Sequence, residues 1–478
     1  MSRQAVRRTP RRHGDDGAGG APPHAGRAAT GTGPVSPGQD PGLPGPGRLA
    51  ATEPAVNSHD IVELVDRFHR DSIRRLHLIP SENTLSTTAR LPFVSDLMYR
   101  YSFPADGPNW AWPGNDDLAA VERAATDGLR ALLGAAHVNL KPVSGLNAMT
   151  VAVSALSQPG GTVLSIAEAD GGHGSTRFIA GQLGRRHHNL PFDPHRYAID
   201  TDALHEIAAS GVLPGPVLVY LDQFMCLFPH DLPAIRAAVG PDTVICYDGS
   251  HVLGLIAGGQ FQNPLAEGAD VLTASTHKSF PGPHKGVLAT NTAHLAQRID
   301  EHAGHWVSHH HPADVAALAI TVADLQGTAH SYATQTVTNA RTLAAALADR
   351  GFTVCGAGLG FTRSHQIWVD VAPFLDPAEA SRLLLIAGIV VNAIEVPYLT
   401  GGTGLRLGVQ EATGRGMGEA EMDEIAAIIR AVLIDRTDPG RLTGRVADLL
   451  DLYPCDGDTL LRQLIDTARA QLPESALR

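Results

Sequence analysis

Between residues 162 and 274, short runs rich in β-branched residues alternate with helical stretches, and this alternation constrains the fold more than any other feature of the chain. The runs are Thr162–Ile166, Val217–Leu221, Thr243–Tyr247 and Val271–Ala274. Strands separated by helices favour a mostly parallel sheet with helices on both faces. In such open sheets, ligands gather at the carboxyl ends of the strands. The sequence therefore predicts an α/β fold with a binding site at that edge.

Helical patterns lie on either side of this region. Ser58 is a plausible N-cap for a helix with apolar residues at positions 61, 62, 64, 65 and 68. Two further helices are expected near Asp116–Leu133 and Gly145–Leu156. Beyond about His330 the pattern changes to that of an α+β region. Its expected elements are a long helix through Leu347, strands at Phe352–Cys355, Gln366–Val371 and Ile389–Ala393, and helices at Pro377–Ala387 and Glu419–Ile434.

These patterns predict four parts of the chain. Residues 1–55 are rich in Gly, Pro, Ala and Arg, and such a segment cannot offset its ordering entropy, so we expect a disordered tail. An over-long start and a segment that folds on a partner are alternatives. Residues 56–90 are expected to form a helical arm, residues 91–330 a large cofactor-binding α/β domain, and residues 331–478 a smaller α+β domain.

Composition narrows the class of partner. The net charge is −12, and the 23 histidines are scattered, so no basic face for nucleic acid or for an anionic membrane is evident. No apolar run approaches the roughly 20 residues that span a bilayer. The four cysteines form no CxxC pair, so no zinc ribbon or disulfide framework is expected. A cytoplasmic enzyme that acts on small molecules is the expectation.

Two strand ends carry side chains that suit one cofactor. The run TVICYD ends in Asp248, and the run VLTAST is followed by His277 and Lys278. A lysine there can bond to the aldehyde of pyridoxal phosphate, while a carboxylate on the next strand keeps the pyridine nitrogen protonated. A solvated lysine at a strand end is the competing interpretation. Lysine is scarce in this Arg-rich chain, and Lys278 is flanked by Ser, Thr and His. Both observations favour a cofactor-binding lysine over a solvated one.

The run DGSHVLGLIAGGQFQNP followed by TASTHKSFPGPHKG resembles the serine hydroxymethyltransferases, which are fold-type I pyridoxal-phosphate enzymes. Further matches follow the same order: LIPSEN at 78–83, NLKPVSGLNA at 139–148, DGGHGS at 170–175 and TGGTGLRLG at 400–408. Together they cover nearly the whole chain after residue 58. The resemblance implies pyridoxal 5'-phosphate as cofactor, a mostly parallel seven-stranded sheet in the large domain, and a homodimer with active sites shared across the interface.

The resemblance also implies which residues hold the cofactor. Ser144 and Gly145 would lie at a helix N-terminus, where backbone N–H groups and the helix dipole favour a phosphate. A helix cap is a second, compatible interpretation of Ser144. His173 matches a histidine that stacks on the pyridine ring, although an ordinary loop residue is the alternative. His277, directly before the reactive lysine, is expected to contact the cofactor.

Other positions match residues that face the substrate. His251, three residues after the acid, would touch the phenolic oxygen of the cofactor or a substrate oxygen. Arg406 matches the arginine that binds the substrate carboxylate, a task that suits a planar bidentate fork; a surface arginine is the alternative. Ser81 resembles a second contact to that carboxylate. Tyr101 matches a tyrosine beside the reactive lysine that the family supplies from the neighbouring subunit.

The chain departs from the family where the family binds folate. The family's Tyr-x-Glu-Gly-Tyr-Pro-Gly run and tyrosine pair correspond to YSFPADGPNWAWPG, residues 101–114. The glutamate position falls on Phe103 or Pro104, and Asp106 could replace it only in a rearranged loop. The tyrosine pair falls on Trp110, Ala111 or Trp112.

Two further departures lie near the active site. WVSHHHP, residues 306–312, replaces a Gly-rich loop, and Leu146 replaces a second phosphate-binding serine. Three consecutive side chains cannot all face one ion, so His309, His310 and His311 indicate altered pocket lining rather than a metal site, and no metal is expected.

These departures would keep aldol chemistry and change the acceptor. The pattern resembles the threonine transaldolase branch, in which L-threonine and an aldehyde give acetaldehyde and a new β-hydroxy-α-amino acid. The high Ala, Arg, Gly and Pro content would suit an enzyme of natural product biosynthesis from a GC-rich genome. The alternatives are a tetrahydrofolate-dependent serine or α-methylserine hydroxymethyltransferase, and a non-catalytic scaffold. The residues expected to take part in catalysis are Lys278, Asp248, His173, His251 and Tyr101.

Overall fold

A seven-stranded sheet occupies the first half of the described chain, in the order β2-β10-β9-β8-β7-β3-β4. Strands β9, β8, β7, β3 and β4 run parallel, whereas β10 is antiparallel to both of its neighbours. The strands are β2 (His137–Asn139), β3 (Thr162–Ser165), β4 (Arg186–Asn189), β7 (Val217–Leu221), β8 (Val244–Asp248), β9 (Val271–Ser275) and β10 (Gly286–Thr290). The predicted α/β class is confirmed, and the four predicted strands match within one residue at each end.

Helices cover both faces of this sheet because successive side chains of a strand point to opposite faces. Leu218 and Tyr220 of β7 belong to one apolar cluster, and Val219 and Leu221 belong to another. The first cluster is completed by α4 (Gly145–Leu156), α5 (Gly174–Gln182) and α10 (Ala293–Trp306), and the second by α3 (Asp116–Leu133), α7 (Leu232–Val239), α8 (Leu253–Ala257) and α11 (Pro312–Leu325). Burial on both sides explains why these strands read as continuous apolar runs.

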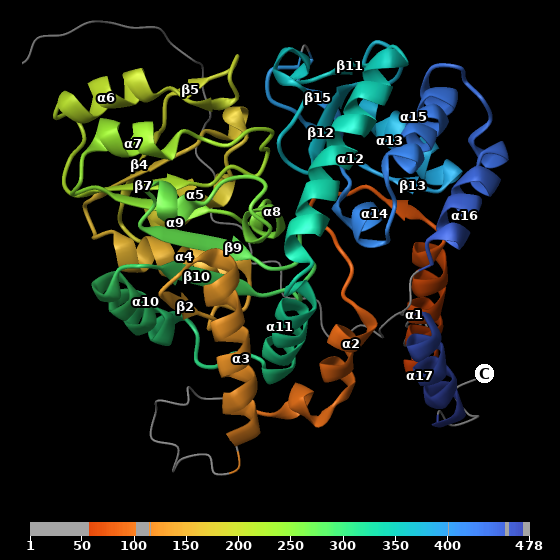
Figure 1. The fold of residues 1–478 in the computed structure, drawn as a ribbon, viewed down its shortest axis with the longest axis horizontal. Helices are drawn as coiled ribbons and strands as arrows, with labels where there is room; N and C mark the ends of the chain where they lie inside the picture. The colour runs from red at the N-terminus through yellow and green to blue at the C-terminus, as the bar shows by residue number, and fades with distance from the viewer. Residues whose placement is uncertain (1–56, 102–113, 115, 400, 455–457, 472–478) are drawn as a thin grey trace, which may run out of the picture. The chain divides into compact units, whose positions relative to one another are not determined.

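A second, antiparallel sheet of four strands follows in the order β11-β12-β15-β14. Its strands are β11 (Thr353–Val354), β12 (Gln366–Asp370), β15 (Thr403–Gly408) and β14 (Asn392–Glu395), and it shares an apolar cluster with α12 (Ala329–Asp349), α13 (Pro377–Ala387) and α15 (Glu419–Leu433). Helix α12 packs against α8 on one side and α15 on the other (Figure 1). The predicted α+β character of this region is confirmed.

The computed structural model describes residues 57–101, 114, 116–399, 401–454 and 458–471. Residues 57–478 belong to one compact unit. The division into an arm (56–90), a large domain (91–330) and a small domain (331–478) therefore stays a prediction. The predicted tail, residues 1–55, lies outside the described residues. No helix in the described ranges is long and apolar enough to cross a bilayer.

The first described helix, α1 (Ser58–Ile73), corrects one expectation. Its N-cap is Asn57 rather than Ser58, because Asn57 Oδ1 accepts a hydrogen bond from Asp60 N and the Asp60 carboxylate accepts one from Asn57 N. This reciprocal pair is a capping box. The apolar face of α1 is 46 to 74% exposed; its residues are Ile61, Leu64, Val65 and Phe68.

Candidate active site

Adjacent strands bring Asp248 and Lys278 together. Strand β8 ends at Asp248, which pairs with Thr273 of β9, and Lys278 follows the end of β9. Both residues line a cavity of about 250 Å³. Five other predicted residues line the same cavity: Ser144, Gly145, His173, His251 and His277. The carboxyl edge of the parallel sheet thus carries this group of side chains, as expected for an open α/β fold.

The lysine and the acid are held in a largely buried setting. Burial lowers the pKa of the Lys278 amine, and the Asp248 carboxylate partly offsets that effect. A lowered pKa favours the neutral amine that can attack an aldehyde. The Asp248 carboxylate accepts hydrogen bonds from Tyr220 Oη (3.1 Å) and Ser250 N (2.9 Å), which fix its orientation.

Helix α4 points its N-terminus at the cavity. Ser144 is its N-cap and accepts a hydrogen bond from Asn147 N at 3.1 Å, so the cap interpretation of this residue is confirmed. The first turn of a helix leaves N–H groups without intrahelical partners, and the helix dipole adds positive potential there. Because Gly145 and Leu146 line the cavity in this turn, the site suits an anionic group such as a phosphate.

Buried polar atoms in the cavity lack partners within the described part of the chain. They are Gln223 Nε2, Ser275 Oγ and His277 Nδ1. A buried polar group without a hydrogen bond costs free energy, so three of them in one cavity fit a polar group that binds there. An amine, a carboxylate and a helix N-terminus around the same space fit pyridoxal phosphate.

We expect Gly145→Ala to weaken both cofactor binding and the fold. A Cβ atom added at Gly145 would lie 2.8 Å from Ser275 Cβ, which is closer than packed side chains tolerate. The free energy of unfolding should fall by about 1–3 kcal/mol, measured by denaturant titration. Cofactor affinity, measured by absorbance titration, should fall as well.

Gly181→Ala is the matched control, because nothing lies within 4 Å of a Cβ atom added to this helical glycine. It should leave cofactor affinity unchanged and stabilise the fold by about 0.5–1 kcal/mol. Equal losses of affinity in the two variants would contradict the proposed close contact at Gly145.

The imidazoles of the cavity have lowered pKa values. Burial lowers the pKa of His173, and Nδ1 of its ring accepts a hydrogen bond from Ser175 N at the start of α5. Burial and the stacked ring of His284, 3.8 Å away between centroids, lower the pKa of His277 to about 3. Burial also holds the pKa of His251 well below its usual value. These rings are therefore suited to stacking and neutral hydrogen bonding at pH 7.

Three predicted residues are not among those that line this cavity. Arg406 on β15 is only 4% exposed, so it is not a surface arginine. Its guanidinium lies 5.4 Å from the ring centroid of Phe224, which lines the cavity, and its Nε has no partner among the described residues. Ser81 is partly buried, and Tyr101 is 48% exposed with its ring 4.1 Å from that of His309.

Sequence reasoning missed the residues that follow β7. Asp222, Gln223 and Phe224 line the cavity, and the pairing of β7 with β8 places Asp222 beside the end of β8. Burial raises the pKa of Asp222 to about 7, while its carboxylate accepts hydrogen bonds from Thr176 Oγ1 (2.5 Å) and Ile166 N (3.0 Å). The carboxyl-edge rule, applied to every strand, would have found them.

The side chains of the three consecutive histidines contact different groups. His310 is buried between Leu140 O and the Glu122 carboxylate, His311 faces Asp314, and His309 contacts Tyr101. None of the three is among the described residues that line the cavity. Within the described ranges, no group of three or more His, Cys, Asp or Glu side chains could hold a metal ion. The folate-side positions considered above lie outside the described residues: Phe103, Pro104, Asp106, Trp110, Ala111 and Trp112.

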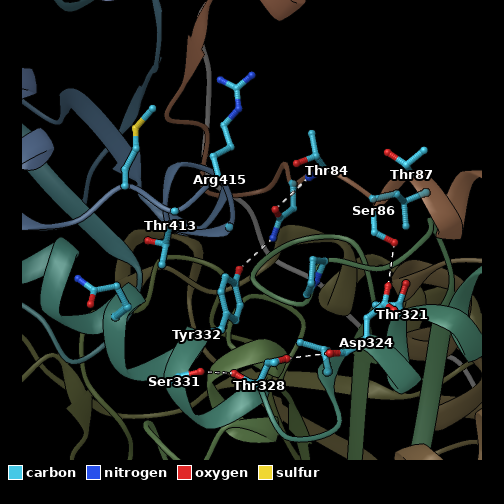
Figure 2. Close-up of a pocket in the computed structure, with 18 of the residues that line it drawn as sticks. Thr84, Ser86, Thr87, Thr321, Asp324, Thr328, Ser331, Tyr332, Thr413 and Arg415 are labelled. Atoms are coloured by element: carbon cyan, nitrogen blue, oxygen red, sulfur yellow. Dashed lines mark hydrogen bonds between the residues drawn. The ribbon is translucent and has the colours of Figure 1, made fainter. Parts of the chain in front are cut away.

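A larger cavity, of about 810 Å³, is shown in Figure 2 and contains none of the predicted site residues. Several polar groups of its wall bond to one another: Ser86 Oγ and Thr328 Oγ1 both donate to Asp324, and Ser331 Oγ donates to Thr328 O (Figure 2). Arg415 also lines this cavity, and its Nε and Nη1 have no partner among the described residues. Asn83 in its wall donates a hydrogen bond to the backbone oxygen of Lys278. The smaller cavity, which holds the reactive side chains, is therefore the candidate active site.

Comparison with known proteins agrees with this geometry. A sequence model of the serine hydroxymethyltransferase family matches residues 55–429 of the 478-residue chain. The chain belongs to the serine hydroxymethyltransferase family. The resemblance seen in the motifs is confirmed, and this protein is, like its family, a pyridoxal-phosphate-dependent transferase.

Relatives in the family carry two kinds of name. The fluorothreonine transaldolase of Streptantibioticus cattleyicolor is 37% identical over 84% of this chain, which spans 65% of that relative's length. The L-threonine:uridine-5'-aldehyde transaldolase of a Streptomyces species is 38% identical to this chain. The match covers 77% of this chain and 87% of the length of that relative. The serine hydroxymethyltransferase of Methanopyrus kandleri is also 38% identical, and the match covers 82% of this chain and 92% of the length of that relative. Sequence identity alone thus leaves both activities open.

A solved structure matches the fold of this family member. The L-threonine transaldolase of Pseudomonas fluorescens superposes with a TM-score of 0.78 at 30% identity, over 83% of this chain and 91% of that one. The predicted fold-type I architecture is confirmed by this match.

Proposed function

We propose that this protein is an L-threonine transaldolase. It cleaves the Cα–Cβ bond of L-threonine, releases acetaldehyde, and joins the retained glycyl unit to a second aldehyde to give a new β-hydroxy-α-amino acid. The observation that carries this proposal is the replacement of the folate-side run by YSFPADGPNWAWPG in a chain that keeps Lys278, Asp248 and Arg406. The names of two relatives and of the solved structure support it.

The residues of the cavity suit this reaction. Pyridoxal phosphate, when bound, supplies an electron sink that weakens a bond at Cα of an attached amino acid. Lys278 would hold the cofactor covalently, Asp248 would keep a proton on its ring nitrogen, and the N-terminus of α4 would bind its phosphate. His173 and His277 would contact it as neutral rings.

Arg406 would orient the amino acid and so determine which bond at its Cα is weakened. Its guanidinium is buried beside Phe224, and a bidentate pair with the substrate carboxylate would fix the orientation of the amino acid. Ser81 would be a second contact to that carboxylate.

Incubation with L-threonine and an aromatic test aldehyde, without folate, is expected to release acetaldehyde. Alcohol dehydrogenase and NADH in the same cuvette would report the release as a fall in absorbance. Omission of the aldehyde should slow the release, since the retained glycyl unit then lacks an acceptor. Failure to release acetaldehyde with a panel of aldehydes would contradict the proposal.

The second candidate is a hydroxymethyltransferase that acts on serine or α-methylserine. It is favoured by the family match and by the relative from Methanopyrus kandleri. Tetrahydrofolate-dependent formation of glycine from serine, in the absence of acetaldehyde release from threonine, would establish it. A non-catalytic scaffold would show no change of cofactor absorbance with any amino acid.

We further propose that the protein works as a homodimer. The exposed apolar face of α1 (Ile61, Leu64, Val65 and Phe68) suits burial against a second copy, and Tyr101 is half exposed outside the cavity, as expected of a residue that serves a neighbouring subunit. Cytoplasmic location and a role in natural product biosynthesis stay predictions.

A further inference from the structure

Gln366, the first residue of β12, is buried with its carboxamide held at both ends. Trp368 Nε1 donates to Gln366 Oε1 at 3.2 Å. An indole N–H can only donate, so this contact fixes the oxygen end of the amide. Gln366 Nε2 then faces three acceptors: Phe224 O at 2.9 Å, His251 Nδ1 at 3.2 Å and, at 3.7 Å, the weaker acceptor Cys226 Sγ.

This contact determines where His251 carries its proton. An amide nitrogen has only hydrogens to offer, so His251 Nδ1 must present a lone pair. Burial holds the pKa of His251 well below its usual value, and the side chains of Lys278 and Arg406 lower it further, so the ring is neutral. A neutral ring with an acceptor at Nδ1 has its proton at Nε2.

The other groups around the ring are consistent with this state. The titratable and charged groups that act on His251 are Lys278, Arg406, His365 and His173. His365 stacks on the ring at 6.0 Å between centroids with an interplanar angle of 13°, and its own Nε2 is bonded to Pro80 O. Among the described residues, none forms a hydrogen bond with His251 Nε2. Since His251 lines the cavity, the Nε2–H group is the donor that the ring can offer there.

We infer that Gln366 is a positioning residue that keeps His251 in its Nε2–H tautomer, so that the ring donates a hydrogen bond to an oxygen of the bound cofactor or amino acid. This inference rests on the proposed function for its ligand, but the tautomer itself can be measured without any turnover. A purely structural Gln366 would fill the core and bond to Phe224 O, with no effect on the cofactor.

The first test uses Gln366→Met, which keeps the length of the side chain and removes both ends of the amide. The visible absorbance of the cofactor-loaded protein is titrated with pH, without amino acid. If His251 donates to the phenolic oxygen of the cofactor, loss of the donor destabilises the ionised oxygen, and the titration midpoint should rise by about one pH unit. If the oxygen belongs to the amino acid, the midpoint stays and the apparent affinity for L-threonine falls about tenfold.

Gln262→Met is the matched control. Gln262 is also buried, accepts from Tyr247 Oη and donates to His230 O, and is not among the residues lining the active-site cavity. It should change neither the midpoint nor the threonine affinity. A Gln366→Met protein that folds normally and matches the wild type in both quantities would overturn the inference.

The second test measures the tautomer directly in protein labelled with ¹⁵N-histidine, with the His251 signals assigned by their loss in His251→Asn. The wild type should show the proton on Nε2. In Gln366→Glu, measured at a pH where the new carboxyl group is ionised, only acceptor oxygens face Nδ1, so the proton should move to Nδ1. A wild type already protonated at Nδ1, or an unchanged tautomer in Gln366→Glu, would contradict the inference whatever the outcome of the threonine assay.

Discussion

Lys278→Ala is expected to abolish the visible absorbance of the bound cofactor and to lower the turnover of L-threonine by at least about a thousandfold. The reason is that Lys278 is the lysine that shares the 250 Å³ cavity with Asp248. Absorbance spectra after reconstitution, together with the acetaldehyde assay, measure both effects.

Lys285→Met is the matched control for this variant. Lys285 is also buried, and burial lowers its pKa to about 8, but it is bonded to Pro142 O and is not among the residues that line the cavity. We expect the visible band to survive in Lys285→Met. Survival of the band in Lys278→Ala, or its loss in a folded Lys285→Met, would show that the wrong lysine has been assigned.

Arg406→Lys is expected to lower kcat/KM for L-threonine by about a hundredfold, because a lysine ammonium cannot reproduce a bidentate pair with a carboxylate. The change should appear in steady-state kinetics and in spectral titrations with threonine. The absorbance of the cofactor-loaded protein without substrate should stay the same.

Arg341→Lys is the control for this substitution. Arg341 lies on α12 and donates from Nε to Thr362 O, away from the cavity. Its replacement should leave kcat/KM unchanged. An Arg406→Lys protein with wild-type kcat/KM would exclude Arg406 as the carboxylate-binding group.

Local patterns predicted the sheet well because the strands are buried on both faces. Val217–Leu221 is an uninterrupted apolar run, and its predicted ends are those of β7. The same rule that gathers ligands at strand ends also placed Asp248 near Lys278. The predicted N-cap at Ser58 was off by one residue, since Ser and Asn cap helices about equally well and only the bonds to Asp60 distinguish them.

Long-range relations were harder to predict. The contact of Arg406 in β15 with Phe224, which follows β7, joins two distant segments and was not predicted. Only the family resemblance indicated a substrate-binding role for Arg406. Asp222 and Gln223 were overlooked because polar residues after a strand usually mark a turn. Gln366 carried a signal that was not used: it is a polar residue at the start of a buried strand, and such a residue needs specific partners.

The most direct test of the central claim is to reduce the cofactor-loaded protein with borohydride, which turns the bond between the cofactor and its lysine into a stable amine, and to map the modified peptide by mass spectrometry. The chain has three lysines, Lys141, Lys278 and Lys285, so the assignment is unambiguous. The account predicts the adduct on Lys278. An adduct on Lys141 or Lys285, or none at all, would contradict it.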